Sequence, residues 1–241
     1  MFGEIKNAQG ERLDYTFHPG ASSARHLAVL GHGVTGNKDR PFVVALAEAL
    51  ARAGVPALRL SFSGNGLSGG RFTDSNITKE VADLGAVLDA LAGWKIAYVG
   101  HSMGGAVGVI RTARDTRISA LVSLAGMVHT KAFAQREFGT VTPDAGCMWD
   151  DEKCPLSQSY MDDLAGIDTV VNLAPAIKVP WLLVHGTEDD VVPISDSREI
   201  FAKANLPAQL LEIKGAGHVF SGDFTRPMTD AVVPWIQARL A

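Results

Sequence analysis

The sequence predicts an α/β fold in which helices cover both faces of a mostly parallel sheet. Short apolar runs that are typical of buried strands alternate along the chain with segments whose apolar residues recur at helical spacing. The 241 residues, 46% of them hydrophobic and 20% charged, suffice for one such domain with a packed core and are few for two. In the segment 96–110, an apolar run, a serine between glycines and a helix of small residues follow one another, as at a strand–turn–helix junction of such a sheet.

The elements before residue 95 supply one side of the predicted sheet. Residues 12–17 alternate polar with apolar side chains, as an edge strand does, and residues 26–30 form a short buried strand. A helix begins at Pro41, which a first helical turn tolerates, and residues 55–62 form the next strand. Asn76 is expected to cap the following helix, whose apolar stripe comprises Ile77, Val81, Leu84, Leu88 and Leu91.

The elements after the serine segment continue the alternation. Strands are expected at residues 118–124, 181–185 and 209–213, and helices at about 195–204 and 227–240. The carboxyl ends of parallel strands lie at one edge of a sheet, and ligands bind in the crevice outside that edge. Catalytic residues are therefore expected in the loops that follow the strands.

The segment between residues 124 and 181 is much longer than a single crossover helix requires. It is too apolar for a disordered linker, since it contains Phe133, Phe138, Met148, Trp149, Tyr160 and Met161. We expect a single domain over residues 1–241, with a small cap inserted at about 128–176 over the carboxyl edge of the sheet. The alternative is a helical embellishment that packs elsewhere on the domain.

Charge and composition argue against several classes of partner. A net charge of -4 and an isoelectric point near 6.0 give no electrostatic reason to expect nucleic acid or an anionic membrane surface. No apolar run approaches the roughly 20 residues of a membrane span, and the first residues lack the pattern of a signal peptide, so we expect a cytoplasmic protein. Cys147 and Cys154 have no histidine beside them and make a poor zinc site. Whether they are bridged, and the oligomeric state, are left open.

Residues Gly100-His101-Ser102-Met103-Gly104 fit the pattern G-x-S-x-G of a nucleophile elbow. In such an elbow a strained backbone holds the serine hydroxyl above the sheet, and the glycines let strand and helix approach closely. The helix that follows directs free N–H groups toward negative charge that develops beside the hydroxyl. The competing interpretation is an ordinary glycine-rich turn, but the strand before and the helix after favour the elbow.

A serine nucleophile needs a general base and a carboxylate that orients the base, and both follow downstream. Glu188, Asp189 and Asp190 come after the strand at 181–185, and His218 comes after the strand at 209–213. The order serine, acid, histidine is one of the three common orders of a serine triad. Chemistry alone does not choose among the three adjacent carboxylates.

The motifs together give a resemblance to a known family. The chain resembles the α/β-hydrolase superfamily over almost its whole length apart from the cap, on residues 32–38 (HGVTGNK), the elbow, His185-Gly186 with Asp189, and Gly217-His218. Within the superfamily it is most similar to small carboxylesterases of the cinnamoyl and feruloyl esterase type, which carry a similar loop at 32–38 and a cap at the same point. The resemblance implies an α/β-hydrolase fold with a mostly parallel central sheet and a small inserted cap.

The resemblance also implies the roles of individual residues. Its spacing makes Asp189 the acid of a catalytic triad with Ser102 and His218. It places the oxyanion hole at the backbone N–H groups of Val34 and Met103, a role that depends little on side-chain identity.

We therefore predict a serine hydrolase that cleaves small carboxylic esters through an acyl-enzyme, without a cofactor or a metal. The glycines of residues 64–69 match a dinucleotide-binding pattern by letter, but the next helix begins only near residue 77, so no such cofactor is expected. The same triad would serve a thioesterase, an amidase or peptidase, or an acyltransferase. A ligand-binding protein without activity on the same scaffold is the alternative from another class.

Overall fold

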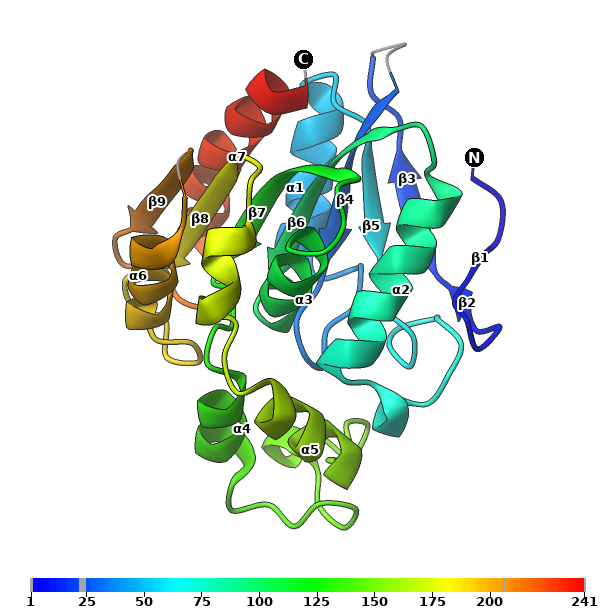
Figure 1. The fold of residues 1–241 in the computed structure, drawn as a ribbon, viewed down its shortest axis with the longest axis vertical. Helices are drawn as coiled ribbons and strands as arrows, with labels where there is room; N and C mark the ends of the chain where they lie inside the picture. The colour runs from blue at the N-terminus through cyan, green and yellow to red at the C-terminus, as the bar shows by residue number, and fades with distance from the viewer. Residues whose placement is uncertain (1, 22–24, 206, 241) are drawn as a thin grey trace.

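The computed structural model describes residues 2–21, 25–205 and 207–240, and a seven-stranded sheet forms its centre (Figure 1). The strand order is β3-β5-β4-β6-β7-β8-β9, and β3 is antiparallel to β5 whereas the other pairs are parallel. The strands are β3 (Tyr15–His18), β4 (His26–Gly31), β5 (Ala57–Leu60), β6 (Lys95–His101), β7 (Ile118–Leu124), β8 (Trp181–Gly186) and β9 (Ala208–Ile213). This sheet confirms the predicted fold class.

The edge strand predicted at residues 12–17 is divided in the structure. Its first part, β2 (Arg12–Leu13), pairs with β1 (Ile5–Lys6) in a separate two-stranded sheet. The break falls at Asp14, whose N–H donates to the Ser68 hydroxyl at 2.8 Å and whose carbonyl oxygen accepts from the N–H of Ser61 at 2.9 Å. Hydrogen bonds to the loop after β5 thus interrupt the continuous strand that the alternation predicted.

Helices cover both faces of the sheet (Figure 1). The helices α1 (Pro41–Arg52) and α7 (Thr225–Leu240) pack on one face, and α2 (Ile77–Ala90), α3 (Met103–Thr112) and α6 (Ile194–Lys203) pack on the other. The side chains of β4 alternate between the two cores, as the pleat of a strand requires. Asn76 caps α2 as predicted, since its side chain accepts from the N–H of Lys79 at 2.8 Å. Within the described ranges every helix is too short or too polar to cross a membrane.

The segment predicted as a cap lies for the most part beyond the carboxyl ends of the parallel strands, where Figure 1 shows α4 and α5 at the bottom of the molecule, whereas its last residues, 171–176, pack against α6 and α3. It comprises α4 (Thr130–Phe138), η2 (Met148–Asp150), α5 (Gln158–Ile167) and η3 (Val171–Ala176). The buried rings of Phe133, Phe138 and Tyr160 pack edge to face and give the segment an apolar interior. That this segment acts as a cap within a single domain stays a prediction.

The strand order reverses between β4 and β6, and this reversal positions the site. From β4 the chain moves outward to β5 and then returns to the other side of β4 as β6. Gly31 at the end of β4 lies opposite Gly100 near the end of β6. Ligands bind at such a reversal because the two loops diverge there. The loops that carry Val34 and Ser102 therefore lie beside the same crevice.

Candidate active site

Ser102 lies at the sharp turn between β6 and α3. Its backbone has φ 52° and ψ -120°, in the left-handed half of conformational space that disfavours residues other than glycine. A Cβ on Gly100 would collide with the backbone of Gly104, and a Cβ on Gly104 would lie 2.5 Å from the carbonyl oxygen of His32. The two glycines are therefore required by the close approach of strand, helix and loop.

The Ser102 hydroxyl is buried at this turn. The residue is 2% exposed, and its Oγ makes no hydrogen bond with any described residue. The backbone N–H of Ser102 donates to the carbonyl oxygen of Leu124 at 2.9 Å, which ties the turn to the end of β7. Buried hydroxyls normally have a partner, so an unpaired one in a rigid turn indicates a functional role.

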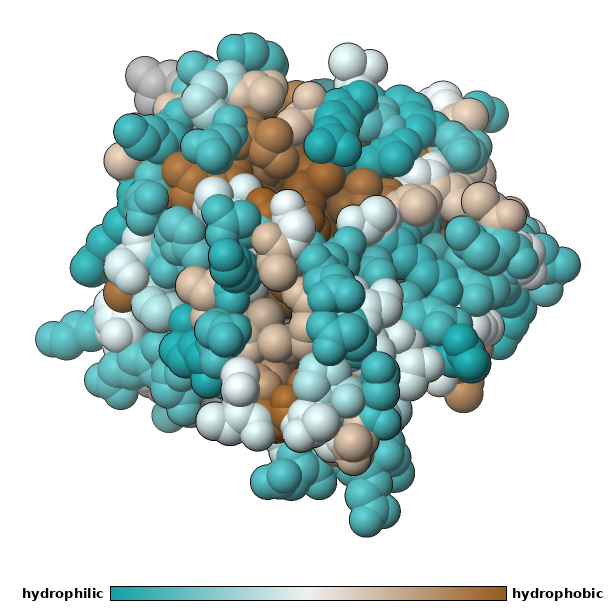
Figure 2. All heavy atoms as spheres, turned by 60° about the horizontal axis from the view of Figure 1, so that its bottom comes forward, coloured by the Kyte–Doolittle hydropathy of each residue, from teal (hydrophilic) through white to brown (hydrophobic). Residues whose placement is uncertain are grey.

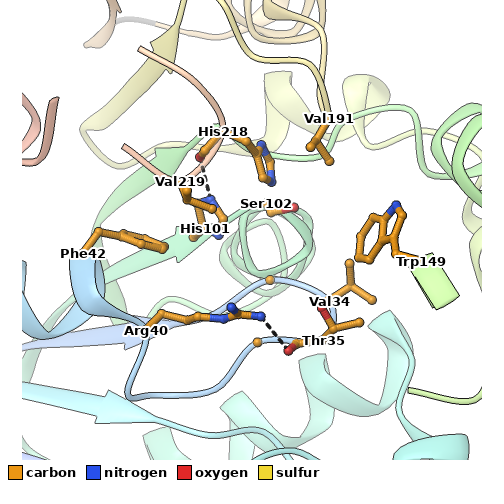
Figure 3. A pocket seen from close by; sticks show the side chains of 12 residues that line it. Val34, Thr35, Arg40, Phe42, His101, Ser102, Trp149, Val191, His218 and Val219 are labelled. Carbon is orange, nitrogen blue, oxygen red and sulfur yellow. Dashed lines mark hydrogen bonds between the residues drawn. The ribbon is translucent and has the colours of Figure 1, made fainter. Parts of the chain in front are cut away.

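His218 contacts Asp189 and lies in the same cavity as Ser102. Its Nδ1 is 2.8 Å from Oδ2 and 3.1 Å from Oδ1 of Asp189. Because an ionised carboxylate only accepts hydrogen bonds, Nδ1 carries the hydrogen and Nε2 is the basic nitrogen of the neutral ring. Figure 3 shows the imidazole next to the Ser102 side chain. Hydrogen bonds of catalytic residues commonly shorten only when substrate is bound.

Asp189 differs from the two acidic residues beside it. Its side chain is fully buried, whereas Glu188 and Asp190 are exposed. Asp189 accepts both hydrogen bonds that Nδ1 of His218 donates, and no bond between His218 and either neighbouring acid occurs in the described structure. The structure thus brings together the acid, base and serine that the resemblance implied, and their catalytic roles stay predictions.

Four hydrogen-bond donors hold the Asp189 carboxylate. Oδ1 accepts from the backbone N–H groups of Val191 at 2.9 Å and Val192 at 2.8 Å, and Oδ2 lies 3.1 Å from Nε2 of His185. Burial alone would raise the pKa of Asp189, but the hydrogen bonds from His185, His218 and the backbone outweigh it and hold the pKa below its usual range. Asp189 is therefore ionised and able to stabilise an imidazolium.

His185 is itself oriented by a residue that the sequence did not indicate. Its Nδ1 lies 2.7 Å from the hydroxyl of Ser197 on α6, and both side chains are buried. Because Nε2 faces the Val192 carbonyl oxygen and Asp189, it carries the hydrogen, and Nδ1 accepts from Ser197. Ser197 thereby positions the histidine that positions the acid.

The backbone N–H groups of Val34 and Met103 have no hydrogen-bond acceptor among the residues that the structure describes. Met103 opens α3, so its N–H has no acceptor within the helix, and Val34 lies in the loop after β4. In the described structure neither group takes part in a hydrogen bond. Gly33 lets the loop approach the elbow, because a Cβ there would lie 2.7 Å from Cβ of Ser102. The arrangement is compatible with the predicted oxyanion hole.

His32 is buried and connects the loop after β4 to the start of the loop after β5. Its Nε2 accepts from the N–H of Phe62 at 3.0 Å, and its Nδ1 lies 2.8 Å from the carbonyl oxygen of Gly33. Burial lowers the pKa of His32 to about 4, so the ring is neutral at physiological pH.

His101, a free position of the elbow motif, holds the loop of the candidate base. Its Nε2 lies 2.9 Å from the carbonyl oxygen of His218, a hydrogen bond that Figure 3 marks with a dashed line. The centroids of the two rings are 4.7 Å apart. Phe42 contacts the ring of His101 at 4.6 Å. Burial, assisted by the charge of His218, lowers the pKa of His101 to about 3. The motif gave no signal for this contact, because it allows any residue at that position.

A cavity of about 380 Å³ opens in front of Ser102 and His218. Its apolar lining comes from Val34, Phe42, Trp149, Val191 and Val219. Figure 2, which turns this end of the molecule forward, shows hydrophobic side chains gathered in a hollow among hydrophilic ones. The volume lies at the small end of the range for ligand pockets, roughly 300–1,000 Å³.

Trp149 brings the predicted cap segment to this cavity. It lies in η2 with φ 49° and ψ 36°, a left-handed conformation that is unusual for a bulky residue. Its Nε1 donates to Glu137 at 3.1 Å, and its ring packs 4.9 Å from that of Phe138 on α4. Trp149 is still 45% exposed despite these contacts, and it lines the cavity.

The structure offers no metal centre in the part of the chain that it describes. Nowhere within residues 2–21, 25–205 and 207–240 do three or more His, Cys, Asp or Glu side chains gather as ligands. Cys147 and Cys154 are both free thiols, which answers the question that the sequence left open. Burial raises the pKa of the Cys154 thiol to about 11, so it is protonated and unreactive at neutral pH.

Curated proteins related to this chain are largely uncharacterised. It is 35% identical over 89 residues to the protein YfhR of Salmonella typhimurium, an alignment of 36% of this chain and 30% of that protein. The matched part thus spans less than a third of that relative. It is 27% identical over 224 residues to Rv2307c of Mycobacterium tuberculosis, which covers 89% of this chain and 70% of that protein.

Solved structures establish the fold. Est1E from Butyrivibrio proteoclasticus with bound ferulic acid is similar with a TM-score of 0.87, at 24% identity over 98% of each chain. The mouse α/β hydrolase domain-containing protein 10 is similar with a TM-score of 0.80, at 19% identity over 98% of each chain. The predicted α/β-hydrolase fold is thereby confirmed.

A family model, that of the prolyl oligopeptidase family, matches residues 44–241. Since this match extends over most of the sequence, the chain belongs to the prolyl oligopeptidase family of α/β hydrolases.

Proposed function

We propose that the protein is a serine hydrolase that cleaves small carboxylic esters through an acyl-enzyme. The observation that carries the proposal is the orientation of His218, whose Nδ1 is occupied by Asp189 so that its basic Nε2 is left for Ser102. An unpaired hydroxyl, an oriented imidazole and an ionised buried carboxylate are the parts that acyl transfer requires. The fold that the chain shares with solved esterases supports the same reaction class.

In the proposed reaction Nε2 of His218 accepts the proton of the Ser102 hydroxyl while Oγ attacks the ester carbonyl carbon. The N–H groups of Val34 and Met103 donate to the oxyanion that forms. His218 then gives the proton to the departing alkoxide, which leaves as an alcohol, and Ser102 carries the acyl group. Water attacks the acyl-enzyme with His218 as base, and the carboxylic acid is released.

The size and lining of the cavity favour a compact acyl or alcohol group with apolar surface. A volume of about 380 Å³ holds a short chain or a single aromatic ring, and the half-exposed indole of Trp149 is available for stacking. The solved structure of Est1E contains ferulic acid, an aromatic acid. We therefore include esters of aromatic acids among the proposed substrates.

Peptide or amide hydrolysis is the second candidate, and the family match favours it. The same triad would cleave an amide, but the residues of an oligopeptide would extend beyond a cavity of this volume. The two candidates differ in which substrate class gives the higher kcat/KM. A panel of methyl and p-nitrophenyl esters measured beside prolyl and alanyl p-nitroanilides decides between them.

Labelling tests the role of Ser102. A serine-directed aryl phosphonate should add once to the parent protein, at Ser102, because there alone a base and two N–H donors converge on the phosphorus. The Ser102→Ala variant should take no label and retain at most the ~10³–10⁴-fold rate over water that binding and the oxyanion hole supply. Ser195→Ala, an exposed serine on α6, is the matched control and should label and turn over like the parent. An adduct on another serine, or an active Ser102→Ala variant, refutes the proposal.

A further inference from the structure

One charged side chain lines the cavity beside the apolar residues, and the proposed reaction does not use it. Arg40 precedes α1, is exposed, and lies in the wall of the cavity with Phe42 and Val219. Figure 3 shows its guanidinium extended along the cavity toward Thr35. The other lining residues besides the histidines carry no charge. A cation in an otherwise apolar wall favours a ligand that carries both an apolar body and an anionic group.

Most N–H groups of the Arg40 guanidinium have no hydrogen-bond partner among the described residues. Its only hydrogen bond within the described residues runs from Nη2 to the carbonyl oxygen of Thr35 at 2.9 Å, and no described carboxylate lies within ion-pair distance. The carboxylate of the neighbouring Asp39 instead forms ion pairs with Nζ of Lys38 at 2.8 Å and Nη1 of Arg59 at 2.7 Å. A guanidinium has five N–H groups, and their forked geometry matches the two oxygens of a carboxylate.

The bond to Thr35 holds Arg40 in the cavity. Thr35 itself is fixed in a left-handed conformation with φ 55°, in the loop that also carries Val34. The charge of Arg40 also acts on His101 beside Ser102. Burial is the main cause of the lowered pKa of His101, and the positive charge of Arg40 lowers it slightly further. Arg40 is thus a pre-oriented cation near the candidate catalytic residues.

We propose that Arg40 binds a carboxylate on the substrate and so makes the site selective for esters that carry a second, free carboxylate group. The proposal rests on the proposed ester hydrolysis and names its substrate class, the half-esters of dicarboxylic acids or esters of carboxylated alcohols and phenols. Arg40 acts through binding and takes no part in bond cleavage. Its effect should therefore appear in the ratio of two kcat/KM values, that of an ester with a free carboxylate and that of its neutral analogue.

Two matched substrate pairs test the proposal and tell which half of the ester carries the carboxylate. For the acyl half, monomethyl adipate is compared with methyl 6-methylheptanoate, in which an isopropyl group replaces the carboxylate. For the alcohol half, 4-acetoxybenzoate is compared with 4-acetoxybenzamide. In at least one pair the parent should prefer the anion, and Arg40→Gln should lower the ratio of kcat/KM by about tenfold, the amount expected for one charge-assisted contact at a partly exposed site.

Two further variants separate a specific contact from a general effect of charge. Arg40→Lys should keep part of the preference for the anionic substrate, because lysine retains the positive charge but lacks the paired N–H donors of the guanidinium. Arg52→Gln, an exposed arginine at the other end of α1, removes the same charge and should leave the ratio unchanged. Raising the salt concentration should reduce the preference of the parent.

A binding measurement keeps the inference independent of turnover. Calorimetric titration of the Ser102→Ala variant with 4-hydroxybenzoate and terephthalate should give tighter binding than titration with 4-hydroxybenzamide and terephthalamide, and Arg40→Gln in that background should remove the difference. Equal ratios in parent and Arg40→Gln, together with equal binding of acids and amides, overturn the role of Arg40. If neutral esters are still hydrolysed through Ser102, the proposed function survives. If no ester is hydrolysed but the acids bind through Arg40, the proposed function and the ester substrate class fail, whereas the binding of a carboxylate by Arg40 stands.

Discussion

The imidazole of His101 lies 2.9 Å from the backbone carbonyl oxygen of His218, so the turn that carries Ser102 also holds the loop that carries the candidate base. The pKa of His101, about 3, keeps its ring neutral in the physiological range. Because the acceptor is a carbonyl oxygen, the single ring hydrogen is on Nε2. This bond couples two loops that are more than a hundred residues apart in the chain.

Removing this bond should impair catalysis more than substrate binding. We expect His101→Ala to lower kcat by about tenfold with KM little changed, because a misplaced base costs rate without removing contacts to substrate. His101→Gln places an amide N–H near the position of Nε2 and should restore most of kcat. A steady-state comparison of the two variants on p-nitrophenyl butyrate checks this, and equal losses in both would assign His101 a packing role only.

The acid of the proposed triad should be distinguishable from its neighbour. Asp189→Asn should lower kcat by about 10²–10⁴-fold, because an amide does not stabilise the imidazolium and favours the wrong tautomer of His218. Asp190→Asn, which alters an exposed side chain, is the matched control and should stay within about twofold of the parent. A larger loss in Asp190→Asn than in Asp189→Asn would make the assignment wrong.

Trp149 should set the preference for aromatic substrates. Trp149→Ala removes the indole face at the cavity mouth and should lower kcat/KM on phenyl and cinnamoyl esters by about tenfold, since a stacked ring contributes roughly 1–2 kcal/mol. Methyl acetate is too small to reach the indole, so its kcat/KM should change little. Leu67→Ala, an exposed apolar residue outside the cavity lining, is the control. The same proportional loss on every ester would contradict a role in selection.

The sequence was most informative where a local pattern requires one backbone geometry. Gly100 and Gly104 could be interpreted as parts of a strand–turn–helix because few other junctions need two glycines at that spacing, and the structure has that junction. The choice of Asp189 depended on the resemblance, because three adjacent carboxylates look alike until one of them is buried against His185. The pairing of β2 with β1 in a separate sheet had no signal, since a strand of two residues such as β1 has no periodicity.

Contacts between distant loops could not be predicted in the same way. The bond from His101 to His218 and the bond from Ser197 to His185 depend on how separate elements meet across the sheet. Arg40 and Trp149 enter the cavity from a loop and from a turn with left-handed backbone angles, and neither position carries a motif. The candidate triad could therefore be predicted from the sequence, whereas the residues expected to select the substrate could not.

Away from the cavity, Glu80 on α2 should make the stability of the protein depend on pH. Its side chain is fully buried, Oε1 accepts from the Ser75 hydroxyl at 3.3 Å, and Oε2 has no partner among the described residues. Burial and the nearby carboxylate of Asp83 raise the pKa of Glu80 well above its usual range. The neutral form is therefore the one that the fold accommodates.

The sign of the effect follows from the raised pKa. In the unfolded chain Glu80 ionises near its ordinary pKa of 4.5, whereas in the folded protein it stays protonated to higher pH, so the folded state binds more protons above pH 4.5. The contribution of Glu80 to the free energy of unfolding is thus complete below pH 4.5 and is lost as the pH rises toward its folded pKa. Glu80→Gln keeps the neutral shape and does not titrate. Urea unfolding of parent and variant between pH 4.5 and 8 should show the variant gaining stability relative to the parent as the pH rises, and a constant difference between the two across this range would contradict the prediction.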